Sequence, residues 1–159
     1  MDANQADRAQ RVYLVIMDET EEARRALRFA ARRSVRTGGT VHILALVPRQ
    51  EFVVFAGIQA TIEAEARERA EVLVTTAAGS LASESGLTPV ISVRNGDGPN
   101  VVRAYLAEHP EVSALVLGAA AEGNPGPLIS YFAGNAGSLP CVLMIVPGLV
   151  DEEGIDAFS

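Results

Sequence analysis

Five short apolar runs alternate along the chain with stretches of helical patterning, and this alternation restricts the fold more than any other feature. Runs of this kind are typical of strands that are covered on both faces of a sheet. Repeated strand–helix–strand order predicts a parallel sheet with helices on both faces. Right-handed crossovers leave few topologies, so we expect a single α/β domain with a doubly wound sheet. The runs lie at residues 12–17, 41–47, 89–94, 114–117 and 142–146.

The interval after the first run carries a clear helical pattern. Thr20 can cap a helix there, and the acidic residues Glu21 and Glu22 complement the helix dipole. Small residues at helical spacing indicate close packing on a sheet. These residues are Ala23, Ala26, Leu27, Ala30, Ala31 and Ser34. Further helices are expected over residues 58–85, after Pro99 and over residues 128–132.

The opposite face of this first helix is basic. Arg24, Arg28, Arg32 and Arg36 are four residues apart, so they form one stripe along the helix. The stripe is either a docking surface for an acidic partner or a solvated face balanced by the acidic first turn. We favour the solvated face, because such stripes are usual on amphipathic helices.

Composition limits the classes of function. A chain of 159 residues with 48% apolar side chains can bury one core. We expect one domain at residues 11–148, between a disordered N-terminus at 1–10 and an acidic tail at 149–159. The net charge of −7 disfavours binding to nucleic acid or an anionic membrane. The sequence has neither a long apolar run nor a signal-like N-terminus, so we expect a cytoplasmic protein.

A glycine- and proline-rich segment after the fourth run is the strongest candidate for a binding site. Gly118 ends that run, and Gly123 and Gly126 precede a short expected helix that contains Ser130. Glycines let backbone N–H groups approach a ligand closely, and a helix N-terminus favours phosphate. The chain contains no lysine, so a Walker phosphate-binding loop is excluded. The glycines could also be simple turn residues.

Asp18 follows the first run directly. In a doubly wound sheet, ligands bind at the carboxyl ends of strands where the winding direction reverses. If this point lies between the first and fourth runs, Asp18 meets Gly118 there and could contact a ribose or a metal ion. The alternative is that Asp18 only helps to cap the following helix.

The two histidines receive no chemical role. His42 stands alone in the second run, without a second histidine, cysteine or carboxylate at metal-ligand spacing. His109 precedes Pro110, where we expect the exposed end of a helix. The sequence therefore predicts no metal site. Because it also lacks a recognisable pairing of nucleophile and base, it predicts no enzyme.

The order of these motifs resembles the universal stress protein family. VYLVIMD at residues 12–18 is similar to the opening of that family, and VRNGD at residues 93–97 is similar to its middle turn. The Gly118 segment and LPCVLMIVP at residues 139–147 resemble the last third, so the resemblance covers about residues 11–148. It implies a five-stranded sheet in the order 3-2-1-4-5, a cytoplasmic stress-response role, homodimers and, in many members, ATP binding.

The resemblance also implies a site for an adenine nucleotide, ATP or AMP, with Mg²⁺. Asp18 and Leu46 would contact the ribose and the adenine. The phosphates would lie on the glycine segment, at Gly118, Gly123, Gly126 and Ser130. Ala121 replaces the second glycine of the family's ATP pattern, and Pro125 and Pro127 lack N–H donors. We therefore expect weak binding or an altered pose; the alternative is a homodimeric interaction protein that binds no nucleotide.

The last apolar run is the expected dimer interface. It would be an edge strand with unpaired backbone groups and no charge to prevent pairing with another chain. Its residues are Val142, Leu143, Met144, Ile145 and Val146.

Overall fold

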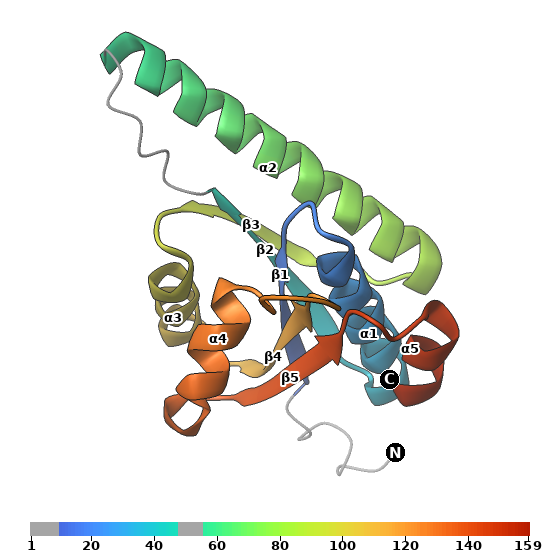
Figure 1. Ribbon diagram of the computed structural model, residues 1–159. Helices are drawn as coiled ribbons and strands as arrows, with labels where there is room; N and C mark the ends of the chain where they lie inside the picture. Colours follow the sequence, from blue (N-terminus) through green and yellow to red (C-terminus); the bar gives the residue numbers. More distant parts are fainter. Residues whose placement is uncertain (1–9, 48–55) are drawn as a thin grey trace.

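The sheet of the computed structural model has the predicted topology (Figure 1). The structure describes residues 10–47 and 56–159, and in this part five parallel strands lie in the order β3-β2-β1-β4-β5. The strands are β1 (Val12–Met17), β2 (Thr40–Val47), β3 (Val90–Asn95), β4 (Val112–Ala119) and β5 (Val142–Pro147). The prediction of a single, doubly wound α/β domain is confirmed. Apart from residue 10, the N-terminal segment predicted to be disordered lies outside the described residues.

Helices cover both faces of the sheet. Figure 1 shows α1 (Glu21–Thr37) and the long α2 (Ala56–Ser85) on one face, with α3 (Gly98–Glu108) and α4 (Pro127–Gly134) on the other. A short 3₁₀ turn, η1 (Ala136–Ser138), follows α4. Among the described residues, no helix combines the length and the apolar character that a membrane span requires.

The central strand β1 is buried along its whole length and divides the core in two. Tyr13 and Val15 belong to the cluster beneath α1 and α2, whereas Leu14 and Ile16 belong to the cluster beneath α3 and α4. Successive strand residues point to opposite faces, so a strand covered on both faces must be apolar throughout. This requirement explains the continuous apolar run in the sequence.

The helical pattern predicted for α1 is confirmed. Thr20 Oγ1 accepts a hydrogen bond from the Ala23 N–H at 3.2 Å and so caps the helix. Gly38 ends it in the left-handed conformation, with a φ of 72°. The buried residues of α1 are Ala23, Ala26, Leu27, Ala30, Ala31 and Ser34, as the spacing predicted.

β4 extends further than the sequence predicted. The expected strand ended before Gly118, but Gly118 pairs with Val146 of β5, and Ala119 pairs with Pro147. A glycine suggests a break in a strand, yet pairing with a neighbouring strand can continue through it. Gly118 is therefore a residue of β4, and the loop begins after Ala119.

The acidic C-terminal segment forms a helix, α5 (Glu152–Phe158), which packs beside α1 (Figure 1). Asp151 caps it by accepting a hydrogen bond from the Gly154 N–H at 2.8 Å. Ile155 is fully buried in the core cluster beneath α1 and α2. The sequence analysis described this segment only as an acidic tail, so the burial of Ile155 was not predicted. A short helix that buries one apolar residue shows no recognisable period in the sequence.

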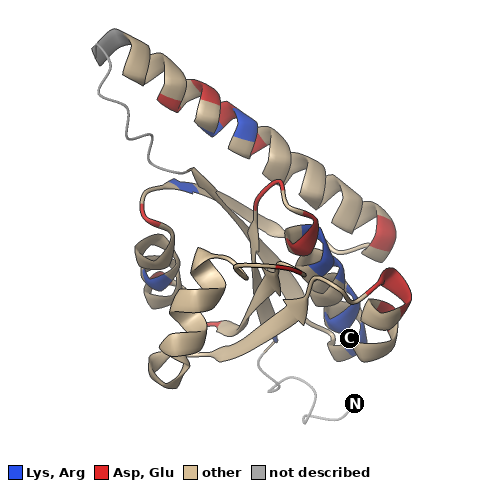
Figure 2. Cartoon of the chain, in the orientation of Figure 1, with Lys and Arg blue, Asp and Glu red and all other residues tan. Residues whose placement is uncertain are grey.

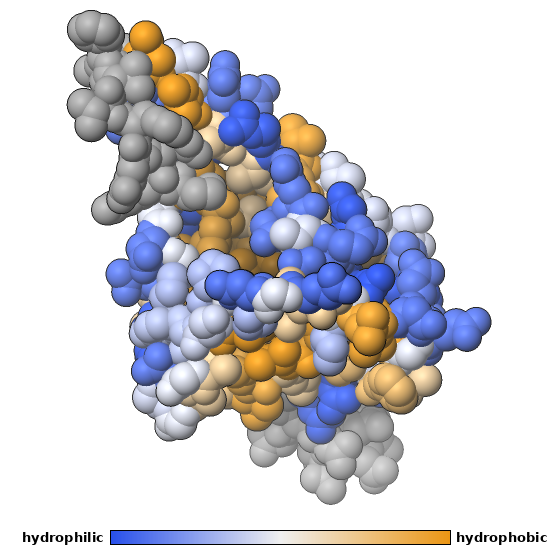
Figure 3. Space-filling view, viewed as in Figure 1, coloured by the Kyte–Doolittle hydropathy of each residue, from blue (hydrophilic) through white to orange (hydrophobic). Residues whose placement is uncertain are grey.

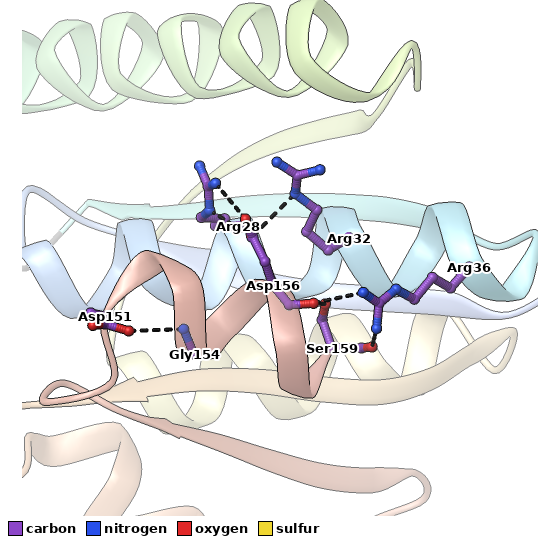
Figure 4. A network of polar contacts seen from close by, with 7 residues as sticks. All are labelled: Arg28, Arg32, Arg36, Asp151, Gly154, Asp156 and Ser159. Atoms are coloured by element: carbon purple, nitrogen blue, oxygen red, sulfur yellow. Dashed lines mark hydrogen bonds and ion pairs between the residues drawn. The ribbon is translucent and has the colours of Figure 1, made fainter.

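The arginine stripe of α1 binds α5 (Figure 4). Arg28 donates from Nε and Nη2 to the two carboxylate oxygens of Asp156, at 3.0 and 2.9 Å, and Arg32 lies 3.3 Å from the same carboxylate. Arg36 donates to the backbone carbonyls of Asp156 and Ser159, at 2.6 and 2.5 Å. Figure 2 shows the basic residues of α1 beside the acidic α5. Arg24 pairs with Glu21 of the first turn, as the solvated interpretation implied, but Arg28, Arg32 and Arg36 have their partners in α5 instead.

The docking of α5 should depend on pH through Asp156. The hydrogen bond from Arg28 holds the pKa of the Asp156 carboxyl below its ordinary value. A depressed folded-state pKa contributes stability that is present above the unfolded pKa, about 4, and is lost as the pH falls through the folded pKa. We expect thermal stability to fall as the pH drops below about 4, and Asp156→Asn to reduce that dependence.

Amide hydrogen exchange at neutral pH provides a second measurement. Asp156→Asn should accelerate exchange in α5, because it removes the charge that the arginines bind. The matched control is Glu153→Gln, which changes an exposed carboxylate of the same helix. Equal exchange in the two variants would contradict the role given to Asp156.

Candidate functional site

Asp18 and Leu46 line one cavity at the carboxyl edge of the sheet. The cavity has a volume of about 250 Å³. Its other lining residues are Glu19, after β1, and Ala66, Arg69, Ala70 and Leu73 of α2. It adjoins a larger hollow of about 720 Å³, which shares Glu19, Arg69 and Leu73 with it. Figure 3 shows the surface hollowed beneath α2 in this region.

Asp18 both lines this cavity and organises the turn before α1. Its Oδ1 accepts a hydrogen bond from the Thr20 N–H at 2.8 Å and a second one from the Thr20 hydroxyl. Among the described residues, Oδ2 has no hydrogen-bond partner, and the side chain is exposed. The capping role weighed from the sequence therefore leaves one carboxylate oxygen for a ligand in the cavity.

Gly118 performs a packing role. A Cβ at this position would lie 2.1 Å from the backbone carbonyl oxygen of Glu22 and 2.4 Å from its carbonyl carbon. Real Cβ atoms do not approach other atoms so closely, so only glycine lets the first turn of α1 rest against β4. This contact accounts for Gly118 without any ligand.

Two backbone N–H groups of the loop after β4 donate hydrogen bonds to acceptors within the same loop. The Ala120 N–H donates to the carbonyl oxygen of Pro125 at 3.3 Å, and the Gly126 N–H donates to Asn124 Oδ1 at 2.9 Å. Gly123 and Gly126 have φ angles of 71° and 116°, which other residues rarely adopt. These two glycines therefore fit the alternative interpretation as turn residues, because the turn requires positive φ angles at both positions.

Ser130 lies on α4, beyond this loop. Its N–H donates to the carbonyl oxygen of Gly126 at 3.1 Å, and its side chain is exposed. The helix begins at Pro127, which has no N–H, so Leu128 and Ile129 supply the unpaired donors of the first turn. Gly123, Gly126 and Ser130 do not line the cavity that holds Asp18 and Leu46.

Leu46 connects the cavity with the helices on the other face. A Cβ added at Gly98, the first residue of α3, would lie 3.5 Å from Leu46 Cδ1 and 3.2 Å from Leu128 Cδ2. The end of β2 and the starts of α3 and α4 therefore meet at one place. The structure brings Asp18 and Leu46 to one cavity and places the start of α4 on the far side of Leu46.

Arg69 is a candidate residue that the sequence interpretation missed. It lines both the cavity and the adjoining hollow, and it makes no ion pair with the residues that the structure describes. In the sequence it is one of several charged residues on the exposed face of a helix, so no signal separates it from Arg67. Arg67 pairs with Glu71, at 3.2 Å.

A second cluster lies at the amino edge of the sheet. His42 Nδ1 is 2.7 Å from the Tyr105 hydroxyl, and His109 Nδ1 is 2.8 Å from Glu111 Oε1. Burial and, to a lesser extent, the neighbouring His109 lower the pKa of His42, so its imidazole is neutral near pH 7. The hydrogen bond from His109 lowers the pKa of Glu111.

The sequence interpretation of His42 was wrong about its surroundings. A second histidine and a carboxylate do stand beside it, with the His42 and His109 ring centroids 5.6 Å apart. His109 is also only partly exposed, because its ring stacks on Tyr105 at 4.2 Å between centroids. These residues are far apart in the sequence, so their spacing along the chain gave no signal.

The model of the universal stress protein family matches residues 11–139. The chain belongs to this family. The resemblance inferred from the sequence motifs is thereby confirmed. A comparison with curated proteins found no match.

Solved structures of universal stress proteins share the fold at low sequence identity. UspA from Lactobacillus plantarum is similar with a TM-score of 0.74 and 19% identity, over 88% of this chain and 99% of that one. The universal stress protein from Archaeoglobus fulgidus, solved in complex with dAMP, has a TM-score of 0.55 and 18% identity, over 86% and 96%. A family protein from Arabidopsis thaliana with AMP bound has a TM-score of 0.57 and 13% identity, over 92% and 99%.

Gly118→Ala should destabilise the fold. The added Cβ would force α1 away from β4, and overpacking of this kind typically costs about 1–3 kcal/mol in the free energy of unfolding. Gly79→Ala is the matched control. It lies within α2, where a Cβ meets no atom within 4 Å, and it should stabilise by about 0.5–1 kcal/mol. Chemical denaturation measures both, and an unchanged stability in Gly118→Ala would refute the packing role.

Proposed function

We propose that this protein is a nonenzymatic, cytoplasmic stress-response module that binds an adenine nucleotide, AMP or ATP with Mg²⁺, weakly or in an altered pose. Family membership supports the stress-response role, and the relatives solved with dAMP and AMP support the ligand class. The observation that carries the proposal is the shared cavity of Asp18 and Leu46 at the carboxyl edge of the sheet. This edge is where doubly wound folds bind ligands.

The size of the cavity supports a nucleotide site that is divided between this cavity and the adjoining hollow. A volume of about 250 Å³ lies just below the range of about 300–1,000 Å³ that is usual for small-molecule pockets. The base and ribose would occupy this cavity, with Leu46 against the adenine and Asp18 Oδ2 toward a ribose hydroxyl. The phosphates would extend into the adjoining hollow, where Arg69 offers a guanidinium without an ion-pair partner among the described residues. Mg²⁺ would neutralise the carboxylates of Glu19, Glu65 and Glu68, which also line this hollow.

The glycine segment is a weaker phosphate site than the family resemblance implies. The N–H groups of Ala120 and Gly126 are already bonded within the loop, and Pro125 and Pro127 have none. Glu122 adds a negative charge that repels polyphosphate unless a divalent cation neutralises it. Each missing charge-assisted hydrogen bond costs about 1.5–3 kcal/mol, so the loss of two or three would weaken binding by orders of magnitude.

The alternative is a homodimeric interaction protein that binds no nucleotide. The exposed apolar residues of the edge strand β5 favour it: Val142 is 59% exposed and Ile145 is 41% exposed. Two further exposed residues, Leu149 and Phe158, accompany them. Figure 3 shows hydrophobic side chains gathered over β5. The basic stripe of α1 contributes less to this alternative, because α5 occupies Arg28, Arg32 and Arg36.

Calorimetry with AMP and with ATP plus Mg²⁺ tests the nucleotide proposal. We expect dissociation constants in the high micromolar to millimolar range, and a further loss of about tenfold or more in Arg69→Gln, the equivalent of one charge-assisted hydrogen bond. The matched control is Arg67→Gln on the same helix, which should leave the affinity unchanged because Arg67 pairs with Glu71.

Two results would contradict this pose. No heat at millimolar nucleotide would favour the interaction protein. Submicromolar ATP binding that Arg69→Gln leaves unchanged would place the phosphates on the glycine segment instead. Gly118 variants are unsuitable here, because their packing defect would confound the affinity.

We also propose a homodimer formed through β5, at Val142, Leu143, Met144, Ile145 and Val146. Val142→Asp should weaken the dimer by at least about tenfold, because it places a charge on the open edge. Val90→Asp is the matched control, since Val90 is 46% exposed on the opposite edge strand, β3. Sedimentation measures both, and a wild-type monomer at micromolar concentration would refute this interface.

A further inference from the structure

Both histidines of the chain meet at the amino edge of the sheet, away from the cavity of Asp18 and Leu46. His42 comes from the start of β2, His109 follows the last residue of α3, and Glu111 immediately precedes β4. One potential ligand atom from each of the three residues lies within 4.8 Å of the other two. Three separate elements therefore deliver the groups to one place, at the opposite ends of the strands from the proposed nucleotide site.

The backbone fixes the relative positions of His109 and Glu111. The His109 N–H donates to the carbonyl oxygen of Tyr105 at 2.9 Å, at the end of α3. The Val112 N–H then donates to the His109 carbonyl oxygen at 3.1 Å and closes a turn. Pro110 occupies the second position of this turn, where its restricted φ is favourable. The two side chains thus project from a short, hydrogen-bonded turn.

Tyr105 orients both imidazole rings. Its buried hydroxyl lies 2.7 Å from His42 Nδ1, which leaves Nε2 as the nitrogen of His42 that can bind a ligand. The phenol ring stacks on His109, with the centroids 4.2 Å apart and the planes at 23°. Histidines that bind metals almost always form a hydrogen bond through their other ring nitrogen, as His42 does with Tyr105. Such a bond fixes the tautomer and the orientation of the ring.

The charges around the cluster suit a cation. Glu111 contributes a carboxylate beside the two imidazoles. Arg94 is the nearby positive charge, with its guanidinium carbon 4.8 Å from the centre of the Tyr105 ring, and it is paired with Glu108. The carboxylate of Glu111 is therefore not neutralised by this arginine.

We propose that His42, His109 and Glu111 bind one divalent transition-metal ion, with Zn²⁺ as the best match. Two imidazoles and one carboxylate are a common set of zinc ligands, and the fourth position would be open to water or another ligand. Zinc bonds to nitrogen and oxygen are about 2.0–2.2 Å long, so the ligand atoms must draw closer together than 4.8 Å. His109 and Glu111 can do so, because their side chains are 30% and 48% exposed.

Titration of the full chain with Zn²⁺, and with Co²⁺ as a spectroscopic probe, tests the site. We expect one ion per chain and visible absorption bands of four-coordinate Co²⁺. His109→Ala and Glu111→Gln should each weaken the affinity by at least about tenfold. Glu153→Gln is the control, because it removes an exposed carboxylate outside the cluster and leaves the pairing of Arg94 with Glu108 intact. Cys141→Ser, which removes the only thiol, should leave the affinity unchanged.

Imidazole NMR signals provide a readout that does not depend on variants at the buried position of His42. The chain has two histidines, so the spectrum contains two rings, and both should shift on addition of one equivalent of Zn²⁺. A shift of His109 alone would indicate adventitious binding at the surface and would overturn the proposal. Absence of stoichiometric binding, or an affinity unchanged in both His109→Ala and Glu111→Gln, would show that the cluster only secures the turn between α3 and β4.

Discussion

The close contact between the first turn of α1 and β4 at Gly118 sets the positions of the elements around it. Because β4 carries no side chain at this point, the Glu22 carbonyl rests where a Cβ would otherwise lie. This contact fixes the start of α1 and, with it, the turn in which Asp18 binds Thr20. It also fixes the line of arginines along α1, and therefore the place where α5 docks. The absence of a Cβ at Gly118 thus determines the positions of both the Asp18 turn, which lines the cavity, and the C-terminal helix α5.

Local patterns predicted the elements whose burial follows from their own sequence. β1 is covered on both faces, and the small residues of α1 repeat at the helical period, so both could be predicted from the chain alone. The extension of β4 through Gly118 could not, because pairing with β5 decides it. Nor could α5 be recognised, since its only buried apolar residue is Ile155 and the partners of Asp156 lie far away in the sequence.

The candidate site was predicted in part, and the division has a physical reason. The family resemblance named Asp18 and Leu46, and the pairing of β1 with β2 explains why these two residues line one cavity. Arg69 depends on how α2 crosses this edge, which the sequence does not specify. The sequence also did not show that His42 and His109 are neighbours, because only the fold brings the end of α3 to the start of β2. Strand order gives the end of the sheet at which a residue lies, but it does not give the residues that a helix delivers there.

If the proposed dimer through β5 forms, the neighbourhood of β5 and α5 would couple association to the docking of α5. A small apolar hollow of about 160 Å³ is lined by Ile145 and Met144 of β5 together with Ile155 and Phe158 of α5. A second chain that covers the β5 edge would also cover Phe158, which is 71% exposed in the single chain. Association and docking of α5 would then stabilise each other by mass action. Local unfolding of the C-terminus would consequently become rarer as the protein concentration rises, so dilution alone would loosen this helix.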